Sequence, residues 1–200
     1  MSAVARVLAV ADEEDRLLAA LLEARTVPQP DLIVSCGDLR PGYLDYVATL
    51  ANAPLVYVRG NHDTDAAGYD HAGGTPLDLR VVRVGGLRVA GLDGSLRYRE
   101  GIVGYSEAEQ WRRCVRLAVR AQMAGGVDVL VTHAPPRGQG DLDDLPHRGF
   151  ACYNWLLRVL RPRLMLCGHV HLSYQRLDRE RTHPCGTRIV NAFGFWEGSC

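Results

Sequence analysis

Five short polar segments hold the residues of this sequence that could do chemistry, and each directly follows an apolar run. They contribute aspartate, asparagine and histidine side chains, the types that bind ligands and move protons. In α/β proteins, ligands bind where the carboxyl ends of strands meet. We therefore expect a site built from the residues that follow these runs. They are Asp12, Asp38, Asn61, His62, His133, His169 and His171.

A glycine precedes three of these side chains, namely Asp38, Asn61 and His169. Glycine lets the chain turn sharply out of a strand, which brings the next side chain to the edge of the sheet. Each residue taken alone has an ordinary structural explanation. Asp12 could cap a helix, Asp38 or Asn61 could form a turn, and a lone His-x-His could be a surface or core pair. Chance alone does not readily place all of them after successive strands.

The segments Gly60-Asn61-His62-Asp63 and Gly168-His169-Val170-His171, in this order with Asp12, Gly37-Asp38 and His133, resemble the calcineurin-like metallophosphoesterase superfamily. The resemblance runs from Asp12 to His171. It implies an α/β fold, a four-layer α/β/β/α sandwich of two mixed β-sheets flanked by helices. It also implies roles for single residues. Asp38 would bridge two metals, and His62 would be the catalytic histidine. Asp12 and His171 would bind the first metal; Asn61, His133 and His169 would bind the second.

The sequence departs from the family pattern at one position. The first motif of the family is usually Asp-x-His, but Glu14 stands where the histidine is expected. Glu14 could replace that ligand, or it could point to solvent at the start of a helix, where acids are favoured. We favour the second interpretation.

The resemblance implies a metal-dependent phosphoesterase that uses two divalent ions, Mn, Fe or Zn with Mn favoured, because imidazole and carboxylate ligands are mixed. A hydroxide bridging the two metals would attack phosphorus, and His62 would protonate the leaving group. We favour a phosphodiester over a phosphomonoester as the small-molecule substrate. The alternative is a weakly active or inactive scaffold that binds a protein partner, as in the retromer subunit of this superfamily.

Other polar residues near the motifs have two interpretations each. Arg59 could contact phosphate or form a salt bridge at a strand end, and Asp63 could orient His62 or serve the local structure. The polar segment 134–150 follows His133, and a loop of this kind often shapes substrate access. Three of its residues could touch phosphate or lie in solvent: Arg137, His147 and Arg148. Two further histidines are expected at the surface: His71 and His183.

Strands and helices must position these residues. They alternate in the first part of the chain, and the later part is richer in antiparallel strands. We expect strands at Val4–Val10, Asp31–Ser35, Leu55–Val58, Leu79–Val84, Leu87–Leu92, Val127–Thr132, Leu164–Cys167, Leu172–Leu177 and Thr187–Val190. We expect helices at Glu13–Arg25, Tyr43–Asn52, Ser106–Ala124 and Gly149–Leu160. Hairpins should turn at Gly85-Gly86 and around Pro184 to Gly186. This βαβαβ opening predicts a mixed sheet system covered by helices.

Ser106 and Glu109 should form a capping box at the start of the third helix. An apolar stripe on that helix is expected to face the core. The stripe consists of Ala108, Trp111, Val115, Ala118 and Val119. Four arginines, Arg112, Arg113, Arg116 and Arg120, should face solvent.

The composition of the chain limits its domain number, its classes of partner and its expected location. The 200 residues fit one domain, 1–200, with 47% hydrophobic residues and a formal net charge of zero. Neutrality argues against dedicated nucleic-acid binding and against an anionic membrane as partner. The N-terminus predicts neither a signal peptide nor a membrane span, so a cytoplasmic location with six reduced cysteines is expected. The aromatic residues near the C-terminus, Phe193, Phe195 and Trp196, could mediate a homo-oligomer, but core or lid packing is favoured.

Overall fold

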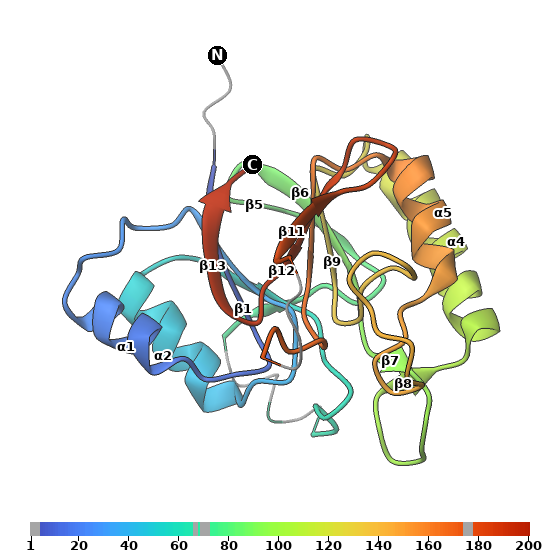
Figure 1. Ribbon diagram of the computed structural model, residues 1–200. Helices are drawn as coiled ribbons and strands as arrows, with labels where there is room; N and C mark the ends of the chain where they lie inside the picture. The colour runs from blue at the N-terminus through green and yellow to red at the C-terminus, as the bar shows by residue number, and fades with distance from the viewer. Residues whose placement is uncertain (1–4, 66–67, 69–72, 174–177) are drawn as a thin grey trace.

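The computed structural model describes residues 5–65, 68, 73–173 and 178–200 of the chain. Two β-sheets lie face to face, and helices cover the outer face of each (Figure 1). This arrangement confirms the expected four-layer α/β/β/α order with two mixed sheets.

The first sheet carries the strands at the start of the chain, and its order is β13-β1-β2-β3-β4. Its strands are β1 (Arg6–Ala11), β2 (Leu32–Ser35), β3 (Leu55–Tyr57), β4 (Thr75–Pro76) and β13 (Gly194–Ser199). Strands β1 to β4 pair in parallel, whereas β13 pairs antiparallel with β1. The carboxyl ends of β1, β2 and β3 therefore meet at one edge of the sheet.

The second sheet has the order β11-β12-β10-β9-β6-β5. Its strands are β5 (Val81–Val84), β6 (Leu87–Leu92), β9 (Val129–Thr132), β10 (Leu164–Cys167), β11 (Glu180–Thr182) and β12 (Arg188–Asn191). The central strands β6, β9, β10 and β12 are parallel, and the two edge strands are antiparallel hairpin partners. A small pair, β7 (Ser95–Leu96) and β8 (Gly104–Tyr105), lies apart from both sheets.

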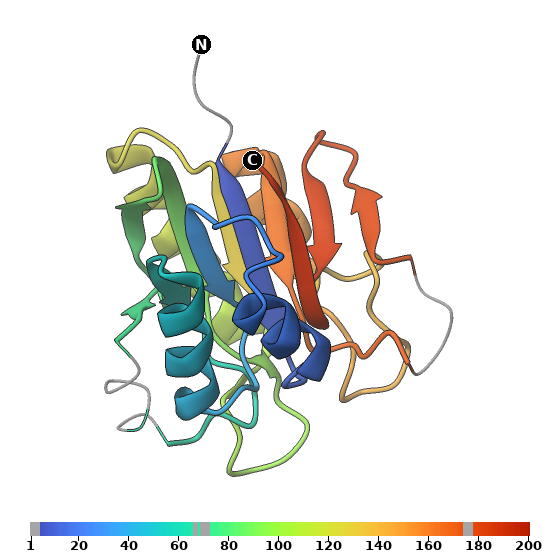
Figure 2. The same cartoon turned by 90° about the vertical axis from the view of Figure 1, so that its left-hand side faces the viewer.

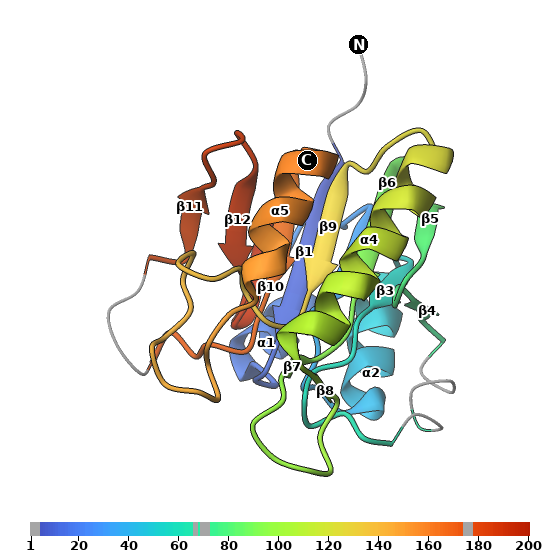
Figure 3. The ribbon, with the colours of Figure 1, turned by 90° about the vertical axis from the view of Figure 1, so that its right-hand side faces the viewer.

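Helices α1 (Arg16–Glu23) and α2 (Pro41–Ala51) cover the first sheet (Figure 2). Helices α4 (Glu107–Met123) and α5 (Ala151–Leu160) cover the second (Figure 3). Between the sheets lies a core of aliphatic side chains, among them Val34 on β2 and Val131 on β9. Strands buried on both faces read as continuous apolar runs, which explains why the central strands could be predicted from sequence.

Helix α4 confirms one expectation and corrects another. The capping box of Ser106 and Glu109 is present. Of the expected apolar stripe, however, only Ala118 is buried; the buried face is rotated by about one residue and consists of Gln110, Cys114, Leu117, Ala118 and Ala121. Trp111 is 42% exposed. Arg113 does not face solvent, because it forms an ion pair with Asp78 and stacks on the Tyr105 ring.

Several strands differ from the sequence prediction. The hairpin that turns near Pro184 exists, but its first strand is Glu180–Thr182; residues 172–173 form a turn, and the rest of the strand expected at Leu172–Leu177 lies outside the described residues. Strands β4, β7, β8 and β13 are absent from the prediction. Trp196 on β13 is buried in the core between the sheets, and Phe195 packs toward α1 and α2. These aromatics therefore pack within the chain. In the described part of the chain, each helix is too short or too polar to cross a bilayer.

Candidate active site

The polar residues expected to form a site do converge at the carboxyl ends of the parallel strands. Asp12 follows β1, Asp38 follows β2 and Asn61 follows β3 in the first sheet, while His133 follows β9 and His169 follows β10 in the second. Backbone hydrogen bonds tie neighbouring strand ends together, from Asp12 N–H to Gly37 and from Gly168 N–H to His133. The site therefore spans the edges of both sheets.

Asp12, Asp38 and His133 form the centre of this cluster. One ligand atom from each lies within 4.8 Å of the others. The His133 ring is completely buried, and its Nε2 lies 3.4 Å from Oδ2 of Asp38. Two carboxylates and an imidazole at this spacing form a donor set that suits a divalent transition metal.

The hydrogen bonds of His133 define what its ring presents to the site. Nδ1–H donates to the carbonyl oxygen of Cys36 at 2.8 Å. Nε2 then faces Oδ1 of Asn61 at 2.9 Å as well as the carboxylate of Asp38. Both neighbours are acceptors, so three atoms with lone pairs point at one another. Such a group needs a proton or a cation between its members, and the residues therefore fit a metal ion.

The pKa values of the cluster follow from burial and from this crowding. Burial raises the pKa of Asp12 to about 7, although the nearby His133 opposes the shift. Burial also opposes ionisation of Asp38, but the charge and hydrogen bond of His133 outweigh it and lower the pKa to about 2. Burial would lower the pKa of His133, yet the carboxylate of Asp38 raises it to about 9. The structure thus stabilises a positive charge among these three side chains.

His169 lies beside His133, with ring centroids 4.8 Å apart. Its backbone N–H donates to both carboxylate oxygens of Asp12, and its Nε2–H donates to the carbonyl oxygen of Pro146 at 2.7 Å. Burial and the neighbouring His133 lower the pKa of His169 to about 3, so the ring is neutral. His171 is half-buried against the Phe193 ring, 4.6 Å between centroids. The aromatic residue Phe193 therefore packs at the site.

His62 and Asp63 form the turn after β3. The carboxylate of Asp63 accepts the backbone N–H groups of Gly60 and Asp38, each at 2.7 Å, so Asp63 holds the two turns together. The N–H of His62 donates to Oδ1 of Asp38 at 2.8 Å. The His62 side chain is exposed and lines a cavity of about 280 Å³ together with Asp38.

Close packing around the turns explains two of the motif glycines. A Cβ on Gly60 would lie 2.1 Å from Oδ1 of Asp38, and a Cβ on Gly168 would lie 2.5 Å from Oδ2 of Asp12. Both distances are shorter than any tolerable contact. The two glycines therefore allow the site carboxylates to approach the backbone.

Two residues with open interpretations form ion pairs. Glu14 accepts a two-pronged hydrogen bond from Arg40, with 2.7 Å from Nε to Oε1, and this pair lowers the pKa of Glu14. Arg59 donates from Nε to Asp93 at 2.8 Å. Glu14 is therefore neither a member of the central cluster nor simply solvated. Arg59 forms a salt bridge, which is one of the two interpretations that its sequence position allowed.

The segment 134–150 folds over the site and is held there by its own contacts. Arg137 donates to the carbonyl oxygen of Gly149, and Arg148 donates to that of Asp143. His147 pairs with Asp144 at 2.7 Å and lies against His169, 5.5 Å between ring centroids. The sequence offered no signal for two contacts: the Pro146 carbonyl at His169, and the Tyr98 hydroxyl 3.4 Å from Nδ2 of Asn61.

The sequence placed two histidines at the surface, and the structure describes one of them. His183 is only 2% exposed, so that expectation is wrong. His71 lies outside the described residues.

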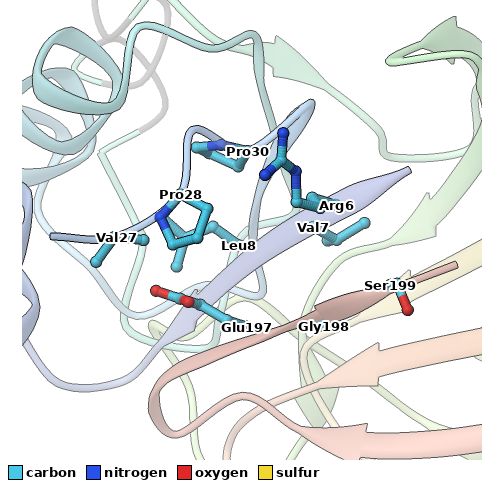
Figure 4. A pocket seen from close by; sticks show the side chains of 9 residues that line it. All are labelled: Arg6, Val7, Leu8, Val27, Pro28, Pro30, Glu197, Gly198 and Ser199. Atoms are coloured by element: carbon cyan, nitrogen blue, oxygen red, sulfur yellow. The ribbon is translucent and has the colours of Figure 1, made fainter. Parts of the chain in front are cut away.

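A separate cavity of about 340 Å³ opens at the opposite ends of the same strands (Figure 4). Arg6 to Leu8 of β1 and Gly198 and Ser199 of β13 line it, together with Pro28 and Pro30 of the segment after α1. Because Asp12 follows the other end of β1, this cavity is not part of the candidate site.

Comparison with known proteins identifies a family model and several proteins that are similar to this chain. A family model described as calcineurin-like phosphoesterase matches residues 10–173. A 3′,5′-cyclic adenosine monophosphate phosphodiesterase, CpdA of Pseudomonas aeruginosa, is 33% identical over 171 residues, which cover 79% of this chain and 59% of that protein. The chain thus spans less than two thirds of the length of this curated relative.

Two crystal structures have the same fold. The first superposes on this chain with a TM-score of 0.74 at 17% sequence identity. The superposition covers 98% of this chain and 95% of the other. The second, the crystal structure of TT1561 from Thermus thermophilus, has a TM-score of 0.66 at 15% sequence identity. This superposition covers 98% of this chain and 99% of TT1561. At these identities the likeness concerns the fold alone.

Proposed function

Because the chain belongs to the calcineurin-like phosphoesterase family, we propose that it is a hydrolase that cleaves a phosphodiester with the help of two divalent metal ions. One observation carries the proposal: Nε2 of His133 faces Oδ2 of Asp38 and Oδ1 of Asn61, all of them acceptors, inside a buried cluster. A cation there would relieve the repulsion between these lone pairs.

The ligands fall into two groups in this proposal. Asp12 and His171 would hold one ion, and Asn61, His133 and His169 the other, with Asp38 shared between them. Manganese is the favoured metal, because the set mixes imidazole with hard oxygen ligands. Two such ions would supply positive charge to the phosphate oxygens and lower the pKa of a water molecule toward neutrality.

His62 is proposed as the proton donor to the leaving oxygen. Its side chain is exposed at the cavity beside Asp38, while its backbone is fixed by the hydrogen bond to that carboxylate. A general acid in this position contributes about 10²–10⁴-fold to the rate. Asp63, which binds backbone N–H groups, would support the turn rather than orient the imidazole.

A diester is favoured over a monoester for two reasons. A monoester carries more charge, yet two arginines near the motifs, Arg40 and Arg59, are already paired with Glu14 and Asp93. The relative from P. aeruginosa is also named for a cyclic phosphodiester. These observations support a small phosphodiester as the substrate class.

The test is hydrolysis of three probes by metal-stripped protein after addition of Mn²⁺: an aryl phosphodiester, an aryl phosphomonoester and 3′,5′-cyclic AMP. We expect diester turnover that depends on Mn²⁺. Asp38→Asn should abolish it and weaken Mn²⁺ binding, whereas His62→Ala should lower kcat by at least about 10²-fold with the metal still bound. Asp45→Asn, an exposed carboxylate on α2, is the matched control and should behave like the parent protein.

Other outcomes separate the parts of the proposal. Faster turnover of the monoester would contradict the substrate class. Two bound metals per chain without turnover of any probe would contradict the hydrolase. One bound metal or none, also without turnover, would favour the scaffold that binds a protein partner.

A further inference from the structure

A cysteine, a histidine and an asparagine lie in contact outside the candidate active site, where the β11–β12 hairpin turns against helix α5. Nδ1 of His183 lies 2.9 Å from Sγ of Cys185, and Nε2 of His183 lies 3.2 Å from Oδ1 of Asn154. A thiol beside an imidazole that is itself oriented by a third group is the arrangement that activates cysteine nucleophiles.

The hydrogen bonds fix the tautomer of His183. Nδ2 of Asn154 donates to the carbonyl oxygen of Arg137 at 2.9 Å, so Oδ1 of the amide is the atom turned toward the imidazole. Oδ1 can only accept, which places the ring proton on Nε2. The backbone N–H of Cys185 donates to Nδ1 at 3.2 Å, which independently requires a lone pair there. The basic nitrogen of His183 therefore faces the thiol.

The other neighbours of the thiol cannot take its proton. Thr187 Oγ1 donates its hydrogen to the carbonyl oxygen of Pro162 and can accept a hydrogen bond from Sγ at 3.3 Å, but a hydroxyl is far too weak a base to remove the thiol proton. The carbonyl oxygen of Leu157 can likewise accept a hydrogen bond from Sγ at 3.4 Å, and an amide carbonyl is also too weak a base. Burial and the charge of Arg158 lower the pKa of His183, which keeps the ring neutral and leaves the lone pair of Nδ1 available to the thiol. His183 is thus the base of this cluster.

Exposure distinguishes Cys185 from most of the other thiols. All six cysteines, each in the described part of the chain, are free, and four of them are buried: Cys36, Cys114, Cys152 and Cys167. Cys185 and Cys200 are partly exposed. Burial raises the pKa of Cys200, and its Sγ contacts the carbonyl oxygen of Asp128 at 4.0 Å. Cys185 therefore combines access with a base.

We propose that Cys185 is a reactive thiol that is modified by small disulfides, with His183 as the base and Asn154 as a positioning residue. In this exchange the proton of Sγ passes to Nδ1 of His183, and Sγ attacks one sulfur of the disulfide. The S–S bond breaks, and the departing thiolate takes the proton from the imidazolium. The products are a mixed disulfide at Cys185 and one free thiol, so no other oxidant is needed.

This site is independent of the proposed phosphoesterase centre. Cys185 precedes β12 (Arg188–Asn191), which runs parallel to β10, whereas two of the proposed ligands, His169 and His171, follow the opposite, carboxyl end of β10. Asn154 donates to the backbone carbonyl of Arg137 in the segment 134–150, and Arg137 is not one of the proposed metal ligands. The proposal thus holds whether or not the chain hydrolyses phosphate esters.

The test is the rate of modification at each cysteine when the 200-residue chain is treated with 2-hydroxyethyl disulfide at pH 7. The reaction is quenched with acid at intervals, and peptide mass spectrometry gives the modified fraction at every site. Cys200 in the same chain is the matched control. We expect Cys185 to react at least about tenfold faster than Cys200.

Variants separate activation from simple exposure. His183→Gln should lower the Cys185 rate at least about tenfold and leave the Cys200 rate unchanged. Asn154→Ala should lower it less, and Asn154→Asp should restore it, because an aspartate still offers an oxygen to Nε2–H. A merely structural role of these residues would change both cysteine rates together and would give no rescue.

Two results would overturn the proposal. One is an equal rate at Cys185 and Cys200 in the parent protein. The other is an unchanged ratio of the two rates in His183→Gln, measured on a variant whose circular dichroism and thermal midpoint match those of the parent.

Discussion

At the residue scale, the cluster is a set of groups that would repel one another without a bound cation or proton. His133 shows this most clearly: its Nδ1–H is committed to Cys36, so only Nε2 can face Asp38 and Asn61. The charge of Asp38 raises the pKa of His133 to about 9 against the effect of burial, whereas burial itself raises the pKa of Asp12 to about 7. A metal ion and a proton therefore compete for the same position.

This competition predicts how metal affinity changes with pH. A ligand must lose its proton before it binds a metal, so affinity rises as pH rises. Between pH 7 and 9, where His133 is still protonated in the metal-free chain, the affinity for Mn²⁺ should rise by roughly tenfold per pH unit. Calorimetric titration in buffers of different ionisation enthalpy measures both the affinity and the protons released.

In the same titration, Asp38→Asn is the informative comparison. Removal of this carboxylate takes away the charge that raises the pKa of His133, so the remaining pH dependence should move to lower pH while the affinity falls. An affinity for Mn²⁺ that is constant from pH 7 to 9 in the parent protein would contradict the proposed role of His133.

At the element scale, the turns after the strands position the site. The turn after β2 and the turn after β3 interlock: Asp63 accepts the backbone N–H groups of Gly60 and Asp38, and His62 N–H donates to Asp38. Asp12, Asp38 and His169 adopt positive φ angles of 64°, 57° and 70°, which non-glycine residues seldom adopt. Such strain persists where surrounding contacts enforce it, and it is concentrated here at the proposed ligands.

Gly60→Ala tests this interlocking. The added Cβ would lie 2.1 Å from Oδ1 of Asp38, so the carboxylate must move. We expect a loss of stability of about 1–3 kcal/mol and loss of Mn²⁺-dependent turnover. Urea unfolding and the phosphodiester assay measure the two effects.

Gly42→Ala is the matched control, because no atom lies within 4 Å of its added Cβ and Gly42 is in helix α2. It should raise stability by up to about 1 kcal/mol and leave turnover unchanged. If Gly60→Ala behaved like Gly42→Ala, the close approach at the turn would not matter for the site.

At the scale of the whole molecule, the last strand of the chain completes the first sheet. Strand β13 pairs with β1 along its entire length, from Arg6 opposite Ser199 to Ala11 opposite Gly194. Its Trp196 reaches the core between the two sheets, where strands from both halves of the chain pack together. The first sheet thus includes a strand, β13, that is distant in sequence from β1, the strand with which it pairs.

Trp196→Ala should therefore destabilise the protein by about 3–5 kcal/mol, because a large buried side chain is removed from the inter-sheet core. Trp111→Ala is the matched control: this side chain is 42% exposed on α4, so the loss should be about 1 kcal/mol or less. Equal losses in urea unfolding would contradict the packing role of β13.

The sequence alone was enough to predict which polar residues stand at the strand ends and most of the strands that carry them. Continuous apolar runs identified the central strands, since both faces of those strands are buried, and the polar residue after each run identified the strand end. These signals are local. The Ser106 capping box and the Gly85-Gly86 hairpin were predictable for the same reason.

Only the tertiary structure decided which partner each of these residues meets. The sequence left open whether Glu14 binds a metal; it pairs with Arg40, 26 residues away. It placed His183 at the surface, whereas the ring is buried between Asn154 and Cys185. The sequence also predicted the wrong buried face for α4, with Trp111 toward the core. Apolar residues lie on two faces of this helix, and the sequence pattern alone does not distinguish which face is buried. The sequence therefore determined which side chains stand at the strand ends, while packing between distant segments determined their neighbours, charges and protons.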